Sequence, residues 1–263
     1  MNIDFTRYKR VFVFGCSFTS YRWPTWADIV VQEMPGVDYY NFGLCGGGNL
    51  LMSIRITEAN LRYKFNESDL VMVMWTTFCR EDRYKDNHWW MTGNIFSAAH
   101  DYPEEFIRKY TDPKGYLIRD LAVITQTTAF LKTLPPTSIT LASVPYDHQM
   151  DPDDTSVKEI LELYKETTLL TPPCLFELEM NGMWENGCEY LDPGHGEPGE
   201  VFYDYHPNPL RYYSYLTKIG MPLTDKSLSY AQHSAAALQK VKTRAELDVS
   251  FLETQCSKSR YIL

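Results

Sequence analysis

A serine directly follows an apolar run near the start of the chain, in the sequence Gly-Cys-Ser17-Phe. An acid and an imidazole, Asp204 and His206, stand two residues apart near the other end. A serine hydroxyl is a weak nucleophile until a base takes its proton, and the base works best when a third group orients it. Ser17, His206 and Asp204 are the residue types of such a triad, which is defined by geometry and not by chain order. Ser17 also suits a helix N-cap, and His206 also suits a surface turn. The choice between these roles and catalysis depends on the elements that position the two residues.

Apolar runs that indicate buried strands alternate with segments of helical spacing. The predicted strands cover residues 11–14, 37–42, 69–75 and 138–144. The predicted helices cover residues 24–34, 49–63, 116–134, 155–170, 209–219 and 228–252. This alternation predicts an α/β fold, a three-layer α/β/α sandwich around a mostly parallel sheet. We expect one domain over residues 1–263, with an aromatic-rich insertion or lid at 78–115 and a long loop at 171–200.

Three of the chemically interesting segments follow predicted strand ends. Ser17 follows the first strand, Gly46 the second, and residues 76–80 the third. In open parallel sheets, binding sites form beyond the carboxyl ends of the strands. We therefore expect residues that are distant in sequence to line one crevice there.

A glycine-rich turn, Asn41-Phe-Gly-Leu-Cys-Gly46-Gly-Gly-Asn49, opens one of the predicted helices. Backbone N–H groups in such a turn can face an anion, either the oxyanion of an acyl-transfer intermediate or a phosphate. The turn has neither the Lys-Ser/Thr of a P-loop nor the GxGxxG spacing.

Composition excludes several classes of function. The net charge of −9 argues against a general nucleic-acid or acidic-membrane binder, since such surfaces need an excess of Lys and Arg. No apolar run reaches the roughly 18 residues of a membrane span, and the N-terminus does not read as a secretory signal, so we expect a cytoplasmic protein. The six cysteines show no metal-ligand spacing. We expect reduced thiols, no metal and no cofactor.

Together these segments resemble the SGNH (GDSL-type) hydrolase family. The run Gly-Cys16-Ser17-Phe is similar to the family's first block, with Cys16 where Asp is common. The run Asp204-x-His206-Pro is similar to the last block, although the family's usual spacing is one residue longer. The resemblance implies a flavodoxin-like α/β/α fold and a serine esterase in which Ser17 attacks an ester carbonyl. His206 then acts as the base, and Asp204 orients it.

The second block of that family is similar to Asn41-x-Gly-x-x-Gly46. The resemblance implies that the backbone N–H groups of Ser17 and Gly46 stabilise the oxyanion. The family's third block supplies an Asn donor, but here that segment reads Trp-Thr76-Thr77-Phe. Thr76, Thr77 and Asn49 are the candidates for the missing donor. The candidates for substrate contact are Arg80, Trp75 and Trp23.

Several alternatives remain open at this level. Cys16 is a rival nucleophile, although adjacent residues leaving a strand point in different directions, which favours Ser17 alone in the crevice. The substrate class that we favour is a small acyl ester such as an O-acetylated carbohydrate, because the aromatic insertion suits sugar rings. An O-acyltransferase or a non-catalytic glycan-binding module on the same fold are the other hypotheses. The replaced third block and the short Asp-x-His spacing favour the binding module. The sequence does not set the oligomeric state.

Overall fold

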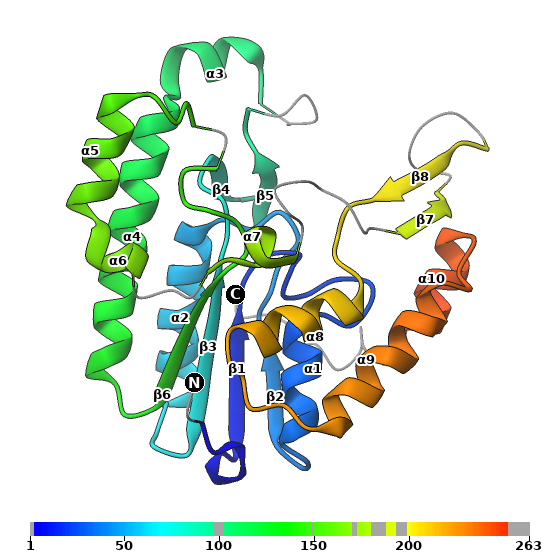
Figure 1. Ribbon diagram of the computed structural model, residues 1–263. Coiled ribbons are helices and arrows are strands. Elements are labelled where there is room, and N and C mark those ends of the chain that lie inside the picture. The colour runs from blue at the N-terminus through cyan, green and yellow to red at the C-terminus, as the bar shows by residue number, and fades with distance from the viewer. Residues whose placement is uncertain are drawn as a thin grey trace.

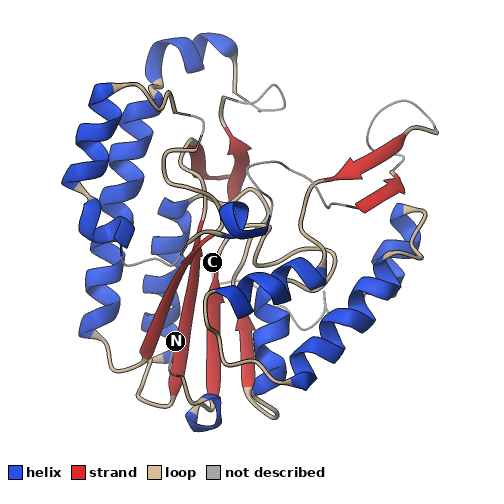
Figure 2. Cartoon of the chain, in the orientation of Figure 1, coloured by secondary structure: helices blue, strands red, loops and turns tan. Residues whose placement is uncertain are grey.

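The computed structural model describes residues 3–96, 102–148, 150–169, 173–179, 188–192 and 199–251. Four strands form the central sheet, and all three pairs in it are parallel. In spatial order they are β2 (Asp38–Asn41), β1 (Arg10–Phe14), β3 (Asp69–Trp75) and β6 (Thr137–Ala142). They run side by side through the centre of the molecule (Figure 2). The four predicted strands are therefore confirmed to within two residues at each end.

Helices cover both faces of this sheet (Figure 1). One group comprises α1 (Trp26–Val30), α8 (Pro209–Lys218) and α9 (Asp225–Leu238). The other comprises α2 (Asn49–Tyr63), α4 (Pro113–Thr133), α5 (Thr155–Leu163) and α6 (Lys165–Leu169). The chain moves in one direction from β1 to β2 and in the other from β2 to β3, so right-handed crossovers place α1 and α2 on opposite faces. The predicted α/β/α sandwich is confirmed.

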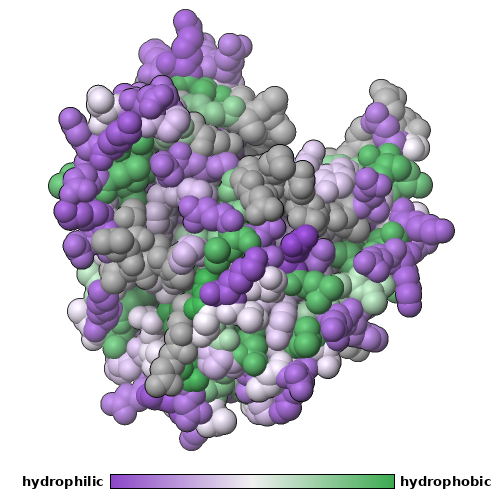
Figure 3. All heavy atoms as spheres, in the orientation of Figure 1, coloured by the Kyte–Doolittle hydropathy of each residue, from purple (hydrophilic) through white to green (hydrophobic). Residues whose placement is uncertain are grey.

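The main core lies around β1 and β3, whose buried side chains pack with those of α1, α2 and α8. β3 is buried along its whole length, as expected for a parallel strand covered on both faces. Hydrophilic residues cover much of the outer helices on the face shown in Figure 3. Within the described ranges, no helix has the length and apolar character needed to cross a membrane.

The predicted insertion at 78–115 contains regular structure. β4 (Arg80–Lys85) and β5 (His88–Asn94) form an antiparallel hairpin, and α3 (Glu104–Tyr110) follows. The two-residue turn between the strands places Asp86 and Asn87 at φ 54° and 64°. Hairpins of this kind favour Asn and Asp at positive φ, so the Asp-Asn pair was a usable signal. The charged sequence of β4 concealed it, because no apolar alternation marks the strand.

The predicted loop at 171–200 also contains regular elements, and two predicted helices are divided. α7 (Leu175–Glu179) and β7 (Cys188–Leu191) lie in the loop region, and β7 pairs antiparallel with β8 (Val201–Asp204). The remaining elements are α10 (Arg244–Ser250) and the 3-10 helices η1 (Phe5–Arg7) and η2 (Val31–Glu33). The helix expected over 155–170 is broken into α5 and α6, and that over 228–252 into α9 and α10.

Gly15, the residue after β1, has no room for a side chain. A Cβ at this position would lie 1.9 Å from Oγ1 of Thr19, whose oxygen already accepts a hydrogen bond from Trp26 Nε1. We expect Gly15→Ala to lower the free energy of unfolding by about 1–3 kcal/mol, the usual cost of overpacking. Urea denaturation at constant m-value measures this change.

Gly115→Ala is the matched control. A Cβ there would meet only Asp112 Cβ at 3.8 Å, and the residue lies in helix α4. This substitution should leave stability unchanged or raise it by up to about 1 kcal/mol. Equal effects of the two substitutions would contradict the steric argument.

Candidate active site

The candidate site lies at the carboxyl ends of β1 and β3, the two central strands. The chain leaves β1 toward β2 on one side and later reaches β3 on the other, so the connections diverge at this point and leave room for a ligand. Phe14 pairs with Val73 near the ends of the two strands. Ser17 follows β1, and Thr76 follows β3 directly. The sheet order thus places these two segments at neighbouring strand ends.

Ser17 lies in a tight turn. The carbonyl of Cys16 accepts hydrogen bonds from the backbone N–H groups of Thr19 and Ser20, at 2.9 and 3.1 Å. Cys16 is fully enclosed in the main core, whereas Ser17 retains 5% exposure. The burial of Cys16 removes it as a rival nucleophile and leaves Ser17 as the candidate at this strand end.

Asp204, the last residue of β8, has a buried carboxylate that accepts four hydrogen bonds. Oδ1 accepts from Nδ1 of His206 at 2.7 Å and from the His206 backbone N–H at 3.1 Å. Oδ2 accepts from the hydroxyls of Tyr21 at 2.5 Å and Tyr190 at 2.9 Å. Burial opposes ionisation, but the contacts with His206 and Tyr21 outweigh it and hold the pKa of Asp204 below its ordinary value. Asp204 is therefore ionised at neutral pH.

The charge on Asp204 fixes the tautomer of His206. An ionised carboxylate only accepts hydrogen bonds, so Nδ1 of His206 must carry the shared proton. Nε2 of the neutral ring then keeps its lone pair, which is the form required of a general base. The short Asp-x-His spacing permits this contact because the carboxylate turns back onto the His206 backbone, as in an Asx turn.

The loop that follows β1 packs against the loop that carries His206. Nε1 of Trp23 donates to the carbonyl of Pro207 at 2.9 Å. The ring of Tyr21 stacks on that of His206, with centroids 3.6 Å apart and planes 19° apart. These contacts hold the two loops together, although they come from opposite ends of the chain.

The loop that carries Ser17 contacts His206 through Phe18. The ring of Phe18, the residue after Ser17, lies 5.4 Å from the His206 ring. Within the described residues, the Ser17 hydroxyl makes no hydrogen bond to His206. Such contacts often form only when a substrate binds, so their absence in a free enzyme is common. The triad as a whole stays a prediction.

Two buried hydroxyls stand directly after β3. Thr76 and Thr77 are 2% and 9% exposed, and neither Oγ1 has a hydrogen-bond partner among the described residues. An unpaired buried hydroxyl costs about 1–3 kcal/mol. Each of these hydroxyls can donate one hydrogen bond to an oxyanion, so both remain candidates for the third donor.

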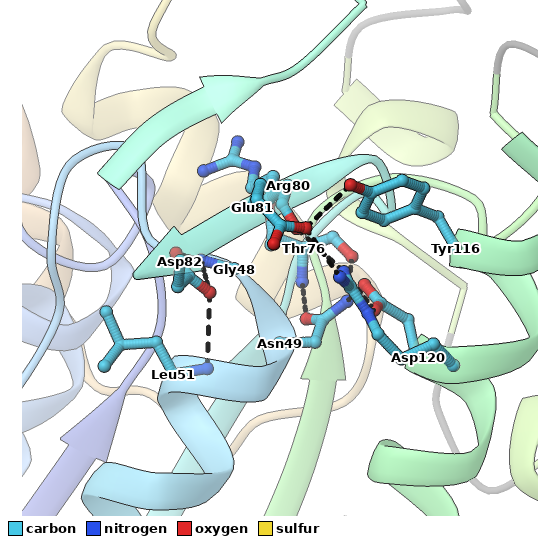
Figure 4. A network of polar contacts seen from close by, with 10 residues as sticks. Gly48, Asn49, Leu51, Thr76, Arg80, Glu81, Asp82, Tyr116 and Asp120 are labelled. Atoms are coloured by element: carbon cyan, nitrogen blue, oxygen red, sulfur yellow. Dashed lines mark hydrogen bonds and ion pairs between the residues drawn. The ribbon is translucent and has the colours of Figure 1, made fainter. Parts of the chain in front are cut away.

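Asn49 has a structural role instead. Its Nδ2 donates to the carbonyl of Thr76 at 3.0 Å and to Asp120 at 2.9 Å, and its Oδ1 accepts from the Thr76 N–H at 2.9 Å (Figure 4). The amide has two N–H hydrogens, and both are engaged. The prediction that Asn49 donates to the oxyanion is therefore wrong, because this side chain joins α2 to the end of β3 and to α4.

The N-terminus of α2 already holds an anion, the side chain of Asp82 on β4. Its carboxylate accepts from the N–H of Gly48 at 3.0 and 3.1 Å and from that of Leu51 at 3.3 Å (Figure 4). Burial nevertheless raises the pKa of Asp82 to about 6. A phosphate cradle at this helix end, one reading of the glycine-rich turn, is contradicted because the protein's own carboxylate fills it.

Gly46 lies outside that contact. Its φ of 79° is in the left-handed region that favours glycine, and a Cβ would lie 2.9 Å from the carbonyl oxygen of Met91 on β5. Among the described residues its backbone N–H donates no hydrogen bond. Its assignment as an oxyanion donor stays a prediction.

Two of the three predicted substrate contacts are wrong. Trp23 and Trp75 are both completely buried, so neither presents a surface to a substrate. Trp23 packs in a smaller core beside Tyr190, and Trp75 packs in the main core. Arg80 is half-buried, and its Nη1 donates to the carbonyl of Gly47 at 3.0 Å, which fastens β4 to the glycine-rich turn. Its role toward a substrate anion stays a prediction.

An aromatic-walled cavity of about 460 Å³ lies between β4, α3 and the start of α4. Its walls include Phe106, Tyr110 and Tyr116, together with the guanidinium groups of Arg83 and Arg119. Glu81 balances these cations, since its carboxylate accepts from the Tyr116 hydroxyl at 2.6 Å and pairs with both arginines. In the described part of the chain, no group of three His, Cys, Asp or Glu side chains could hold a metal ion.

Sequence reasoning missed three residues that shape this site. Tyr21 and Tyr190 bind Asp204, and Asp82 caps α2. No sequence signal marks these tyrosines among the chain's 19. Asp204 is 183 residues from Tyr21, and Tyr190 lies in the segment predicted as a loop. The sequence does show an acidic pair, Glu-Asp82, after the third strand. It gives no sign that Asp82 caps α2, because that helix lies earlier in the chain.

No protein-family model matches this chain, and no curated protein matches it. Among similar solved structures is a lipolytic protein of the G-D-S-L family from Veillonella parvula, 15% identical, with a TM-score of 0.44 over 81% of this chain and 99% of that one. A catalytic variant of an acetylxylan esterase from Geobacillus stearothermophilus is 14% identical, with a TM-score of 0.41 over 81% and 94%. An alpha/beta hydrolase from the metagenome of Lake Arreo is 12% identical, with a TM-score of 0.42 over 82% and 97%. Similarity at this level assigns no activity, so the function must be argued from the site itself.

The raised pKa of Asp82 predicts that the free energy of unfolding depends on pH. Its pKa rises from 3.8 to about 6 on folding, so its contribution to stability is full below pH 4 and is lost as the pH rises through 6. We expect the free energy of unfolding of the wild type, relative to Asp82→Asn, to fall by about 3 kcal/mol between pH 4 and pH 7. Urea denaturation of both proteins across this range measures the difference.

Asp154→Asn provides a control of opposite sign. Hydrogen bonds from Ser156 and Lys114 lower the pKa of Asp154 to about 2. Its contribution is therefore present above pH 4 and is lost as the pH falls, so the wild type should gain stability relative to this variant as the pH rises from 2 to 4. A flat difference for Asp82→Asn would show that its carboxyl titrates normally.

Proposed function

We propose that the protein is a serine esterase or deacylase that acts on small acyl esters. The observation that carries this proposal is the buried, ionised Asp204, whose contact with Nδ1 leaves Nε2 of His206 available as a base. That base lies against the loop that presents Ser17 at the end of β1.

The proposed reaction has two stages. Nε2 of His206 takes the proton from Ser17 as Oγ attacks the ester carbonyl, and Asp204 stabilises the imidazolium that forms. The oxyanion receives hydrogen bonds from the backbone N–H groups of Ser17 and Gly46 and from the hydroxyl of Thr76 or Thr77. His206 returns the proton to the leaving alcohol. Water then attacks the acyl-Ser17 with His206 again as the base, releasing the acid and restoring the serine. Attack by another alcohol in place of water would make the protein an acyltransferase.

An acylated carbohydrate is the substrate class that we favour. The aromatic walls formed by Phe106, Tyr110 and Tyr116 offer flat faces for sugar rings. We further propose that residues 78–115 act as a lid over the site. The close approach of Met91 to Gly46 supports this, because it places the β4–β5 hairpin against the glycine-rich turn.

A fluorophosphonate probe tests the proposed nucleophile. It should add once to the wild type, and the adduct should be absent from Ser17→Ala, as read by intact mass. Removing the base in His206→Ala should slow the labelling by about 10⁴-fold or more, judged by what triad deletions cost. Screens of short-chain esters and acetylated sugars would then define the substrate.

The controls are Ser20→Ala, in the same turn as Ser17, and Cys16→Ala. Both should label at the wild-type stoichiometry, because Ser20 has no proposed role and Cys16 is enclosed in the core. A folded wild type that does not label would refute the activated serine. Glycan-binding assays would then test the non-catalytic alternative.

The unpaired hydroxyls after β3 give a second test. Thr76→Val and Thr77→Val keep the side-chain shape and remove one hydroxyl each. The variant that loses the oxyanion donor should hydrolyse esters about 10²–10³-fold more slowly. It should nevertheless unfold at equal or higher denaturant concentration, since a buried unpaired hydroxyl is removed.

A variant that loses activity while keeping or gaining stability identifies an oxyanion donor, because replacing a structural residue would lower both. The other threonine serves as the internal control, because only one donor is needed beside the two backbone N–H groups. If neither variant changes the rate, the third donor is not a threonine hydroxyl.

A further inference from the structure

We infer that Tyr21 and Tyr190 are positioning residues that hold the carboxylate of Asp204 in one orientation, and through it the catalytic tautomer and direction of His206. This inference rests on the proposed function and deepens it. Neither tyrosine belongs to the motifs that suggested the triad, and the two come from different parts of the chain.

The hydrogen bonds to Asp204 divide cleanly between its two oxygens. Among the described residues, Oδ2 accepts from the two tyrosine hydroxyls, at 2.5 Å from Tyr21 and 2.9 Å from Tyr190, while Oδ1 accepts from the ring and backbone N–H groups of His206. A carboxylate has about four lone-pair sites, so this one is saturated. Rotation of the carboxylate would break both tyrosine contacts, and the Oδ1 atom is therefore kept facing His206.

Tyr21 also touches the base itself. Its ring lies 3.6 Å from the His206 ring in a nearly parallel stack, and Trp23 packs edge-on against it at 4.8 Å. One side chain thus fixes the acid through its hydroxyl and the imidazole plane through its ring. Phe at position 21 would keep the stack and remove only the hydrogen bond, which allows the two contributions to be separated.

Tyr190 donates to the same oxygen from strand β7. It is 2% exposed and lies on β7, where it pairs with Phe202 two residues before Asp204. The hairpin of β7 and β8 therefore carries both the acid and one of its donors. This gives the two-stranded sheet a role in the site that its position at the edge of the molecule does not suggest (Figure 1).

Both tyrosines are suited to remain donors. Burial and the negative charge of Asp204 raise the pKa of Tyr21 and of Tyr190 well above the ordinary value, so neither ionises in the working range. The positive charge of Arg22 has an opposite and smaller effect on both pKa values. The hydroxyl of Tyr21 in turn helps to keep the pKa of Asp204 low.

The test is an NMR titration of the His206 ring in the full-length protein, assigned with His206→Ala, for wild type, Tyr21→Phe and Tyr190→Phe. Losing a donor makes Asp204 more basic, so the acid-side midpoint of the coupled Asp204–His206 pair should rise by about 0.5–1 pH unit per hydroxyl removed. Fluorophosphonate labelling of the same proteins should slow about ten-fold for each variant, and its acid limb should move in the same direction.

Tyr205→Phe is the matched control. Tyr205 stands between Asp204 and His206 in sequence but is 53% exposed, and its ring packs on Tyr203. It should shift neither the titration nor the labelling. An unchanged midpoint in both Tyr21→Phe and Tyr190→Phe, with circular dichroism showing a folded protein, would overturn the inference even in an active enzyme. A shifted midpoint in a protein that never labels would support the tyrosine contacts and refute the esterase.

Discussion

The candidate site depends on one buried negative charge. A carboxylate that leaves water pays a large desolvation penalty, so it stays ionised only when hydrogen bonds replace the water. Asp204 meets that requirement with donors from three segments: the loop after β1, strand β7 and the His206 loop. Satisfying the charge therefore requires the two ends of the chain to meet. The contacts with His206 and Tyr21 that keep the acid ionised also place the His206 ring, so one set of interactions does both.

The sheet order explains why this meeting occurs at the end of β1. With β2 and β3 on opposite sides of β1, the connections diverge and leave the first strand end uncovered by its own crossovers. The glycine-rich turn runs along one side of this opening, fastened by the Asn41 amide to the carbonyl of Thr19 at 2.9 Å. Asp82 occupies the adjacent helix end. The most obvious anion-binding feature of the fold is therefore occupied by the protein's own carboxylate, and the proposed function assigns the oxyanion donors to the Ser17 turn, Gly46 and the end of β3 instead.

The sequence predicted best those features that depend on neighbouring residues in the chain. Apolar runs located the four strands of the sheet, and the parallel arrangement predicted for them implied that Ser17 and Thr76 lie at the same edge. It failed where the partner is remote. An amide such as Asn49 looks free until Asp120 and the end of β3 are placed around it. Trp23 and Trp75 were candidates for substrate contact, but the sequence does not show whether an aromatic ring near a strand end faces the site or the core. The charged strand β4 lacked the apolar alternation on which strand prediction depends.

The polar groups at the candidate site differ in how many of their hydrogen bonds are formed. The acid beside His206 is fully hydrogen-bonded, whereas two hydroxyls at the end of β3 are not, within the described ranges. On the side of the base, the lone pairs of the Asp204 carboxylate are all engaged, which fixes where the proton resides. On the side of β3, the hydroxyls of Thr76 and Thr77 are buried and have no partner among the described residues. A donor that is already paired in the resting protein cannot respond when charge develops on a substrate, whereas an unpaired and rigidly held one can do so without reorganisation. Under the proposed function, the hydroxyls of Thr76 and Thr77 are groups at the end of β3 that can donate to a developing oxyanion without breaking an existing hydrogen bond.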